Sequence, residues 1–369
     1  MTLSNIFFGK KVVQQAYLNN ALIYQSKGWE TLPSTCSEVW TKTYDNYMPT
    51  AIGKDSQDNI YVGAADFLYK IDTEGRVIWK TESLSFDKDS LSWDYYRIRS
   101  LLVSTDCIYC SVYGYQALND IYKFNIAKVA TDGTLIKSIN LSAITSDTND
   151  DWVFDMTKDA SNMYFSTNSM LFKFDLNLNL LAKAYIPYAG FSVTTTDTSK
   201  YVFVGTRDNQ YNSGYVYRYD KSDLGNRFKI PYNTGFWVTS IKLAFNDILY
   251  VGSVQKGFIN TYDAESGKAI ATINCNGFCS AICTDYQENV YFAFYHAVNS
   301  DRYTTYAKYS SDGTCIWDNL LIDTTNTSIS VYYRPTQIIT DSKGNIYITY
   351  YNTNSYLTIK KFINLVKEN

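Results

Sequence analysis

The stretch that decides the fold is DSQDNIYVGAADFLYKIDTEGRVIWK, residues 55–80. It contains three short apolar runs, IYV, LYKI and VIWK, which are separated by polar turns. The turn from Asp72 to Gly75 is typical of a tight hairpin, because glycine reaches the positive φ that such turns need. An apolar run ahead of comparable units, such as SAICTD or TQIITD, supplies one more strand. The stretch therefore predicts a four-stranded antiparallel unit, whose strands we letter a to d from the innermost outward.

The same pattern recurs along the whole chain, for example as DSKGNIYITYYNTNSYLTIKKF at residues 341–362. One aromatic position of strand b aligns in seven units, at Tyr61, Tyr109, Tyr164, Phe203, Tyr250, Tyr291 and Tyr347. Repeats of about 40–50 residues that hold four short strands are the signature of a β-propeller blade. We expect an all-β, single-chain propeller of seven blades, with this aromatic row packed in its core.

The last repeat ends soon after LTIKKFI, which leaves it without a good fourth strand. Residues 37–45, SEVWTKTYD, resemble the outer strands VIWKTE and CIWDNL of other repeats. We therefore expect residues 37–45 to complete the last blade, which closes the ring and removes a long sheet edge. The predicted domains are a β-hairpin segment at 1–30, a linker at 31–36 and the propeller at 37–369.

Composition excludes several classes of function. The chain has 369 residues with 33 Lys and Arg against 36 Asp and Glu, a net charge of −3 that gives no reason to expect nucleic-acid binding. A single histidine, His296, rules out metal sites that need two imidazoles. The seven cysteines show no disulfide framework or complete metal-ligand spacing, and we interpret them mainly as small buried side chains. We expect no metal, no cofactor, no leader peptide and no membrane insertion.

Residues 1–30 depart from the blade pattern and contain their own imperfect duplication, NIFFGKKVVQQ followed by AYLNNALIYQS. The pair Asn19-Asn20 between two apolar runs is a strong hairpin signal. Isolated two-stranded hairpins are marginal in water, so we expect this segment to dock on another protein or on copies of itself. The residues predicted to make that contact are Ile6, Phe7, Phe8, Val12, Tyr17, Leu18, Leu22, Ile23 and Tyr24.

Two resemblances bear on function. The blades resemble the quinoprotein-type (PQQ-like) propeller repeat, most closely at DNIYVGA (58–64), DAESGK (263–268) and GNIYITY (344–350). Quinone dehydrogenases of that family carry adjacent cysteines beside the cofactor, whereas no two cysteines are adjacent here. The resemblance thus implies a scaffold without the cofactor, since fold does not carry function.

The second resemblance covers about 30 residues. NIFFGKKVVQQAYLNNALIYQS is similar to short N-terminal segments of virion structural proteins from tailed bacteriophages, although Asn19 or Asn20 replaces a glycine of their second half. In that group the segment implies attachment to the particle, with the rest of the chain projecting outward. It further implies assembly in the host cytoplasm and several copies per particle.

The predicted connections have unequal lengths on the two faces of the propeller. The a–b and c–d turns are short and polar, while the b–c and d–a connections are long, for example at 83–100, 112–120, 295–303 and 323–334. Aromatic residues on supported loops are typical of a recognition surface, and flat rings beside Asp and Asn suit sugars. The candidate ligand-binding residues on this face are Trp93, Tyr95, Tyr96, Tyr113, Tyr115, Trp152, Tyr211, Trp237, Tyr303, Tyr332 and Tyr333. For any single one of them, packing is the alternative interpretation.

The sequence thus predicts a non-enzymatic virion protein of a tail fibre, baseplate, head fibre or capsid decoration. Its partners would be other virion proteins through residues 1–30, and a host-surface glycan or protein through the propeller. Two alternatives stay open. One is a polysaccharide-active enzyme that uses a pair of acidic residues on the same face, where we expect Asp87, Asp89, Asp94, Asp150, Asp151, Asp208 and Asp301. The other is a purely structural adaptor.

Overall fold

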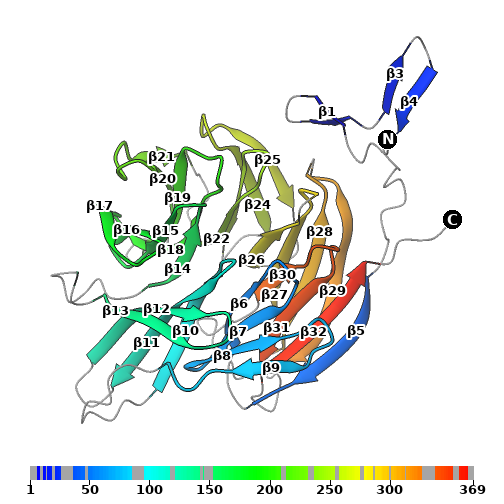
Figure 1. The fold of residues 1–369 in the computed structure, drawn as a ribbon. Coiled ribbons are helices and arrows are strands. Elements are labelled where there is room, and N and C mark those ends of the chain that lie inside the picture. Colours follow the sequence, from blue (N-terminus) through cyan, green and yellow to red (C-terminus); the bar gives the residue numbers. More distant parts are fainter. Residues whose placement is uncertain are drawn as a thin grey trace.

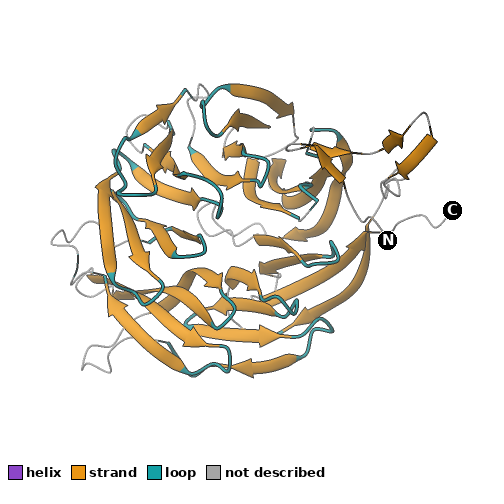
Figure 2. Cartoon of the chain, turned by 45° about the horizontal axis from the view of Figure 1, so that its top comes forward, coloured by secondary structure: helices purple, strands orange, loops and turns teal. Residues whose placement is uncertain are grey.

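In the computed structural model every described regular element is a β-strand, and the strands form a ring of blades (Figures 1 and 2). The structure describes residues 6–8, 11–13, 15–18, 21–25, 36–45, 49–84, 95–116, 121–141, 144, 153–208, 213–231, 237–253, 257–274, 278–285, 287–298, 301–311, 313–325, 337–351 and 357–364. Within these residues, no helix is long and apolar enough to span a bilayer.

Seven four-stranded antiparallel sheets make up the ring, each ordered from the inner strand outward. Blade 1 consists of β6 (Pro49–Lys54), β7 (Ile60–Ala64), β8 (Phe67–Ile71) and β9 (Val77–Lys80). Blade 2 consists of β10 (Tyr95–Val103), β11 (Cys107–Gln116), β12 (Ile121–Ala130) and β13 (Leu135–Asn140). Blade 3 consists of β14 (Asp155–Lys158), β15 (Asn162–Ser166), β16 (Met170–Asp175) and β17 (Leu180–Tyr185).

Blade 4 consists of β18 (Ala189–Thr194), β19 (Tyr201–Arg207), β20 (Val216–Asp220) and β21 (Phe228–Ile230). Blade 5 consists of β22 (Val238–Leu243), β23 (Ile248–Ser253), β24 (Phe258–Asp263) and β25 (Ala269–Asn274). Blade 6 consists of β26 (Phe278–Thr284), β27 (Val290–Val298), β28 (Asp301–Tyr309) and β29 (Cys315–Thr325). Blade 7 consists of β30 (Gln337–Thr340), β31 (Ile346–Tyr351), β32 (Leu357–Asn364) and β5 (Cys36–Thr43). The seven-bladed propeller is confirmed.

An N-terminal strand closes the ring, as predicted. β5 pairs antiparallel with β32, with Thr43 opposite Thr358 and Cys36 opposite Asn364. Trp40 in β5 also reaches the first blade, because its Nε1 donates to the backbone oxygen of Thr73 at 3.1 Å. The first and last blades are therefore joined by sheet pairing and by side-chain contacts.

The aligned aromatic row is packed in the core, as expected: all seven side chains are at most 1% exposed. The structure adds a polar partner that the alignment did not predict. In blades 1, 3, 6 and 7 the tyrosine hydroxyl donates to the aspartate that begins the a–b turn, as from Tyr291 to Asp285 at 2.9 Å and from Tyr164 to Asp159 at 3.0 Å. The same aspartates accept backbone N–H bonds within the turn, so each one holds its turn against strand b.

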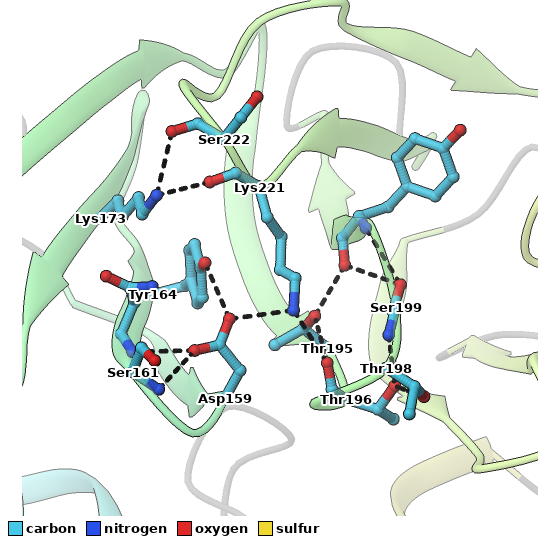
Figure 3. Close-up of polar contacts among 12 residues, drawn as sticks. Asp159, Ser161, Tyr164, Lys173, Thr195, Thr196, Thr198, Ser199, Lys221 and Ser222 are labelled. Carbon is cyan, nitrogen blue, oxygen red and sulfur yellow. Dashed lines mark hydrogen bonds and ion pairs between the residues drawn. The ribbon is translucent and has the colours of Figure 1, made fainter.

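Basic side chains of strand c connect several blades to the next one. The Nζ of Lys128 donates to the backbone oxygen of Leu176 at 2.9 Å, and that of Lys173 donates to the oxygen of Lys221 at 2.7 Å (Figure 3). Lys361 makes the equivalent bond to Thr73 at 3.0 Å, from the last blade to the first. Each acceptor lies in a c–d turn, so these turns serve as docking points between blades.

Polar side chains cover the inner edges of the blades. Strand a is the inner edge strand of each sheet, and side chains of the preceding blade accept hydrogen bonds from some of its backbone N–H groups. Ile241 N donates to Ser192 Oγ at 3.2 Å, and Leu243 N donates to Thr194 Oγ1 at 3.1 Å. Ile52 N likewise donates to Gln337 Oε1 at 2.9 Å across the ring closure. An edge strand whose backbone N–H groups are already hydrogen-bonded to side chains does not readily pair with another strand.

Several segments that were predicted to be long loops form the ends of β-strands, so the loop prediction was wrong for these segments. β11 runs to Gln116 and β12 begins at Ile121, while β27 and β28 leave only residues 299–300 between them. The physical reason is cross-strand packing: alternating aromatic residues pair across the hairpin, as Tyr113 does with Phe124 at a ring-centroid distance of 5.0 Å. His296, also expected in a loop, lies in β27 opposite Tyr303 of β28.

The N-terminal residues form two hairpins that are sheets separate from the blades, as Figure 1 shows. β1 (Ile6–Phe8) pairs with β2 (Lys11–Val13), and β3 (Gln15–Leu18) pairs with β4 (Ala21–Gln25). The register shifts at Ile23, so Tyr17 lies opposite Leu22. The predicted strands are present, while the predicted turn Asn19-Asn20 lies outside the described residues.

Candidate recognition face

The candidate site lies where strand a begins and strand b ends in each blade. The b–c and d–a connections leave from this side of the ring, and we call it the b–c/d–a face. Of the predicted ligand-binding residues, Trp93, Trp152, Tyr211, Tyr332 and Tyr333 lie outside the described residues. Tyr95 and Tyr303 are placed by their backbone alone, in β10 opposite Tyr115 and in β28 opposite His296.

The other four predicted residues are described with their side chains. Tyr96 and Tyr115 are half-buried in blade 2, and Tyr113 is buried, with 4% of its surface exposed. Trp237 is half-buried just before β22, and its Nε1 donates to the backbone oxygen of Asp208 at 3.1 Å. Tyr113 therefore packs in the core between blades 2 and 3, while the other three residues are partly exposed.

A row of stacked rings and guanidinium groups crosses blades 2 to 5 on this face. We call it the aromatic–arginine arc, and its members in spatial order are Tyr113, Arg99, Phe154, Phe191, Arg207 and Trp237. All except Tyr113 are half-buried. The arc links two predicted residues, Tyr113 and Trp237, through four that the sequence analysis did not select.

Each guanidinium of the arc lies close to two rings. The Arg99 Cζ is 5.9 Å from the ring centroid of Tyr113 and 5.7 Å from that of Phe154. The Arg207 Cζ is 5.4 Å from the centroid of Phe191 and 3.4 Å from that of Trp237. Contacts of this kind contribute roughly 0.5–2 kcal/mol each, depending on how far the pair is desolvated.

The centre of the arc is a pair of stacked phenylalanines. The rings of Phe154 and Phe191 are 4.5 Å apart between centroids, at an interplanar angle of 20°. Phe154 precedes β14 of blade 3 and Phe191 belongs to β18 of blade 4, so the stack crosses a blade boundary. Arg99 and Trp237 extend it into blades 2 and 5, and the framework of the ring thus sets the positions of all six side chains.

A second aromatic pair lies on the same face of blade 4. The rings of Tyr188 and Tyr215 stack at 5.0 Å, and Lys229 Nζ lies 3.5 Å from the centroid of Tyr215. The neighbouring Tyr217 is buried, and burial raises its pKa to about 12. The Tyr217 hydroxyl therefore stays protonated in the neutral range, and Lys229 adds a further cation to the face.

Asp155 lies at the inner end of this face, directly after Phe154. It accepts hydrogen bonds from Ser100 Oγ at 3.2 Å, Ser192 Oγ at 3.1 Å and Val193 N at 3.0 Å. Burial raises the pKa of Asp155 above its ordinary value, although these hydrogen bonds act to lower it. Because the partners belong to blades 2 and 4, the carboxyl of Asp155 bridges three inner strands.

The described residues contain no group of three or more His, Cys, Asp or Glu side chains that could hold a metal ion. Among the acidic residues expected on this face, Asp208 is buried, with 4% of its surface exposed. Asp301 is placed by its backbone alone, in β28 opposite Val298. The remaining five lie outside the part of the chain that the structure describes: Asp87, Asp89, Asp94, Asp150 and Asp151.

Four members of the arc were not predicted from the sequence, because they belong to predicted core strands or directly adjoin them: Arg99, Phe154, Phe191 and Arg207. In such strands an aromatic residue ordinarily indicates packing. A usable signal was present: an aromatic residue occurs at or just before the start of strand a in three consecutive repeats, at Phe154, Phe191 and Trp237. The sequence could not show that two arginines lie between these rings.

No protein-family profile and no curated protein matches the chain. Solved structures do match it. They include a chain of the mitotic checkpoint complex (TM-score 0.62, 12% identity, covering 94% of this chain and 98% of that one) and the Pan2 WD40 domain of Neurospora crassa (TM-score 0.60, 10% identity, 90% and 97%). Virginiamycin B lyase from Staphylococcus aureus is also similar (TM-score 0.57, 14% identity, 89% and 99%). At these identities the likeness establishes the seven-bladed propeller fold alone.

Proposed function

We propose that the protein is a non-enzymatic recognition component of a tailed-bacteriophage particle. Residues 1–30 would attach it to other virion proteins, and the b–c/d–a face would bind a glycan or protein of the host surface. The observation that carries the recognition role is the aromatic–arginine arc, since its partly exposed rings and cations are held by four blades of a rigid scaffold. Preorganised aromatic and arginine side chains are the residues that dominate binding surfaces.

The attachment role is supported by the resemblance of residues 5–26 to virion N-terminal segments and by the two separate hairpins. Two-stranded sheets gain little stability alone, so a partner surface would stabilise β1–β4. The residues proposed for that contact stay those predicted from the sequence.

The attachment role is tested by incorporation into particles. A chain that lacks residues 1–30 should remain folded and should be absent from purified virions, while the full chain is incorporated. Undiminished incorporation of the shortened chain would contradict the attachment role.

The recognition role is tested by binding of the purified protein to host cells. Phe191→Ala and Trp237→Ala should each weaken binding by about tenfold or more, as expected for central anchors of an interface. Phe228→Ala is the matched control, because Phe228 also stacks on an arginine (Arg218, 4.8 Å) but at the opposite side of its blade, near the c–d turn. Equal binding by all three variants would place recognition elsewhere.

The alternative is a polysaccharide-active enzyme, which would use two carboxylates on the same face. If the protein is an enzyme, incubation with host cell wall should release reducing ends. A protein that binds cells without releasing reducing ends is a recognition protein.

A further inference from the structure

We propose that the outer strands of the propeller bind the N-terminal hairpins of a second copy of this chain, so that copies join head to tail. This inference rests on the attachment role of residues 1–30, and it names another copy of the chain as their partner. The surface lies on the side of the ring that carries the a–b and c–d turns. We call this side the turn face, and it is opposite the b–c/d–a face.

The outer strands of six blades carry a β-bulge at the same position. In blade 1, successive residues of β8 lie opposite Trp79 and Val77, so Ile78 between them is the extra residue. Equivalent register shifts occur in blades 2, 3, 5, 6 and 7. The extra residue is Ile, Leu or Val in all six blades, and in five of them between 47% and 55% of its surface is exposed. We call these five the bulge row: Val39, Ile78, Ile136, Leu181 and Ile270.

The bulge row favours a protein partner that binds through side chains. A single exposed aliphatic residue is normal on a protein surface, whereas recurrence at one position in five blades indicates an interaction surface. The ring itself uses the next residue, since Trp79 donates to the oxygen of Thr131 in the following blade at 3.0 Å. A bulge also interrupts the regular hydrogen-bonding edge of the outer strand, which disfavours the addition of another strand. The partner would therefore contact the exposed aliphatic side chains.

Anionic side chains lie near the bulge row in blades 2 and 3. The N–H of Thr134 donates to Asp132 at 2.9 Å and holds the pKa of Asp132 below its ordinary value. Burial raises the pKa of Asp175, but hydrogen bonds from Asn179 and Asn177 lower it by more. Both carboxylates are therefore ionised at neutral pH. The c–d turns of these blades, residues 131–134 and 176–179, contain no lysine or arginine, so a basic partner fits here.

Residues 1–30 have the complementary chemistry. They contain Lys10, Lys11 and Lys27 against a single acidic residue, Glu30, which gives the segment a net charge of +2. The rest of the chain has 30 Lys and Arg against 35 Asp and Glu, a net charge of −5. The segment also holds the apolar residues that were predicted to dock on another surface. Opposite charges beside matching apolar residues favour contact between the segment and a propeller.

The hairpins are connected to the ring at the turn face. β5 begins at Cys36, which lies opposite Asn364. Trp40 of β5 pairs with strand c at the position where Trp79 pairs in blade 1, so the start of β5 corresponds to the start of β9 beside its c–d turn. A segment that leaves one copy at this face and docks on the outer strands of another makes a heterologous contact. Such contacts repeat from copy to copy and build rings or chains.

The test is self-association of the full-length protein, measured by sedimentation velocity at about 150 mM salt, where weak surface attraction is screened. We expect oligomers larger than a dimer, with a mass that grows as the protein concentration is raised. A protein that stays monomeric at every concentration would overturn the inference.

Two double variants then locate the contact. The rim variant, Ile136→Glu with Leu181→Glu, changes the bulge row, and the hairpin variant, Phe7→Glu with Leu22→Glu, changes the N-terminal segment. Each should weaken self-association by about tenfold or more, as expected when apolar anchors of an interface are replaced by charges. Tyr185→Glu is the control, because Tyr185 is 59% exposed at the other end of β17, and it should associate like the wild type. Thermal melts of every variant separate lost association from lost folding.

An equimolar mixture of the two double variants tests the head-to-tail arrangement. The rim variant keeps working hairpins and the hairpin variant keeps a working rim, so the mixture should form dimers and nothing larger. A mixture that stays monomeric would show that the contact joins like surfaces, and unchanged association by either variant would place it elsewhere; both results overturn the inference. If the inference fails while the chain without residues 1–30 is absent from virions, the attachment role stands with a different partner. If that shortened chain is incorporated normally, the attachment role itself fails.

Discussion

At the scale of single residues, glycines in strand b allow neighbouring blades to approach closely. A Cβ built on Gly63 would lie 2.6 Å from Ile98 Cγ2, and one on Gly252 would lie 2.5 Å from Cys279 Sγ. In each case the obstructing side chain belongs to strand a of the next blade. These glycines are required by contacts between blades that are distant in sequence, and the repeat pattern alone does not reveal which of them are needed.

Gly252→Ala tests this close approach. The added methyl group must displace Cys279 in a packed interface, so we expect it to lower the free energy of unfolding by about 1–3 kcal/mol. Urea denaturation measures the change. Gly225→Ala is the control, because its Cβ would meet only the exposed side chain of Asp223, and a loss of similar size there would contradict the explanation.

The turn aspartates make a residue-scale prediction about pH. Burial raises the pKa of Asp159, but hydrogen bonds from Lys221, Ser161 and Asn162 lower it by more, so its pKa lies below the ordinary 3.8 (Figure 3). A carboxyl with a depressed folded pKa contributes stability above its unfolded pKa and loses that contribution as the pH falls through its folded pKa.

We therefore expect the urea midpoint to fall as the pH is lowered from about 5 to below 4, and to fall less steeply in Asp159→Asn, which has no carboxyl at this position. The same measurement on Asp197→Asn, an exposed carboxyl in the a–b turn of the next blade, should follow the wild-type slope. Identical slopes for all three proteins would show that Asp159 contributes nothing to acid sensitivity.

At the scale of elements, β5 has the largest consequence because it joins the two ends of the propeller. Its Trp40 packs edge-on against Tyr347 of blade 7, at a centroid distance of 6.1 Å, and donates to Thr73 of blade 1. The sequence predicted this strand from its likeness to other outer strands, since the Trp recurs at Trp79 and Trp317. What the likeness did not reveal is that Trp79 makes the same kind of bond to the following blade, to the oxygen of Thr131 at 3.0 Å.

Trp40→Ala should therefore weaken the closure more than its partial exposure suggests. We expect a loss of about 3 kcal/mol in the free energy of unfolding, at the lower end for large-to-small aromatic changes. Val39→Ala, at the adjacent position with 47% of its surface exposed, should change it by less than about 0.5 kcal/mol. Equal losses for the two variants, compared by denaturant titration, would show that the Trp40 contacts do not hold the closure.

At the scale of the whole molecule, the hairpins and the ring make separate contributions. β1–β4 form their own two-stranded sheets, whereas β5 is part of blade 7. Removal of residues 1–30 should leave the thermal midpoint of the propeller within about 2 °C of the full chain, whereas removal of residues 1–45 should lower it by roughly 10 °C or more. Calorimetry of the two shortened chains tests this, and a large decrease with the first deletion would show that the hairpins stabilise the ring.

Prediction from the sequence succeeded for the ring, whereas the arc emerged only from the tertiary structure. The packed aromatic row and the N-terminal closure follow from a local strand pattern that the chain shows in seven repeats. The arc could not be predicted, because Arg99 and Phe154 meet across one blade boundary and Arg207 and Trp237 across another. The extent of the b–c hairpins was mispredicted for a related reason, since the pairing of Tyr113 with Phe124 lengthens strands that looked like loops.

The sequence by itself determined that this protein is a seven-bladed propeller with an N-terminal closing strand and two preceding hairpins, because strand pattern, turn chemistry and repeat length are local properties. Only the tertiary structure decided which side chains form a surface. The ring brings the inner ends of blades 2 to 5 together, and it thereby stacks two arginines between aromatic residues that lie tens of residues apart in the chain. Contacts across blade boundaries depend on the curvature of the closed ring, and no single repeat contains that information.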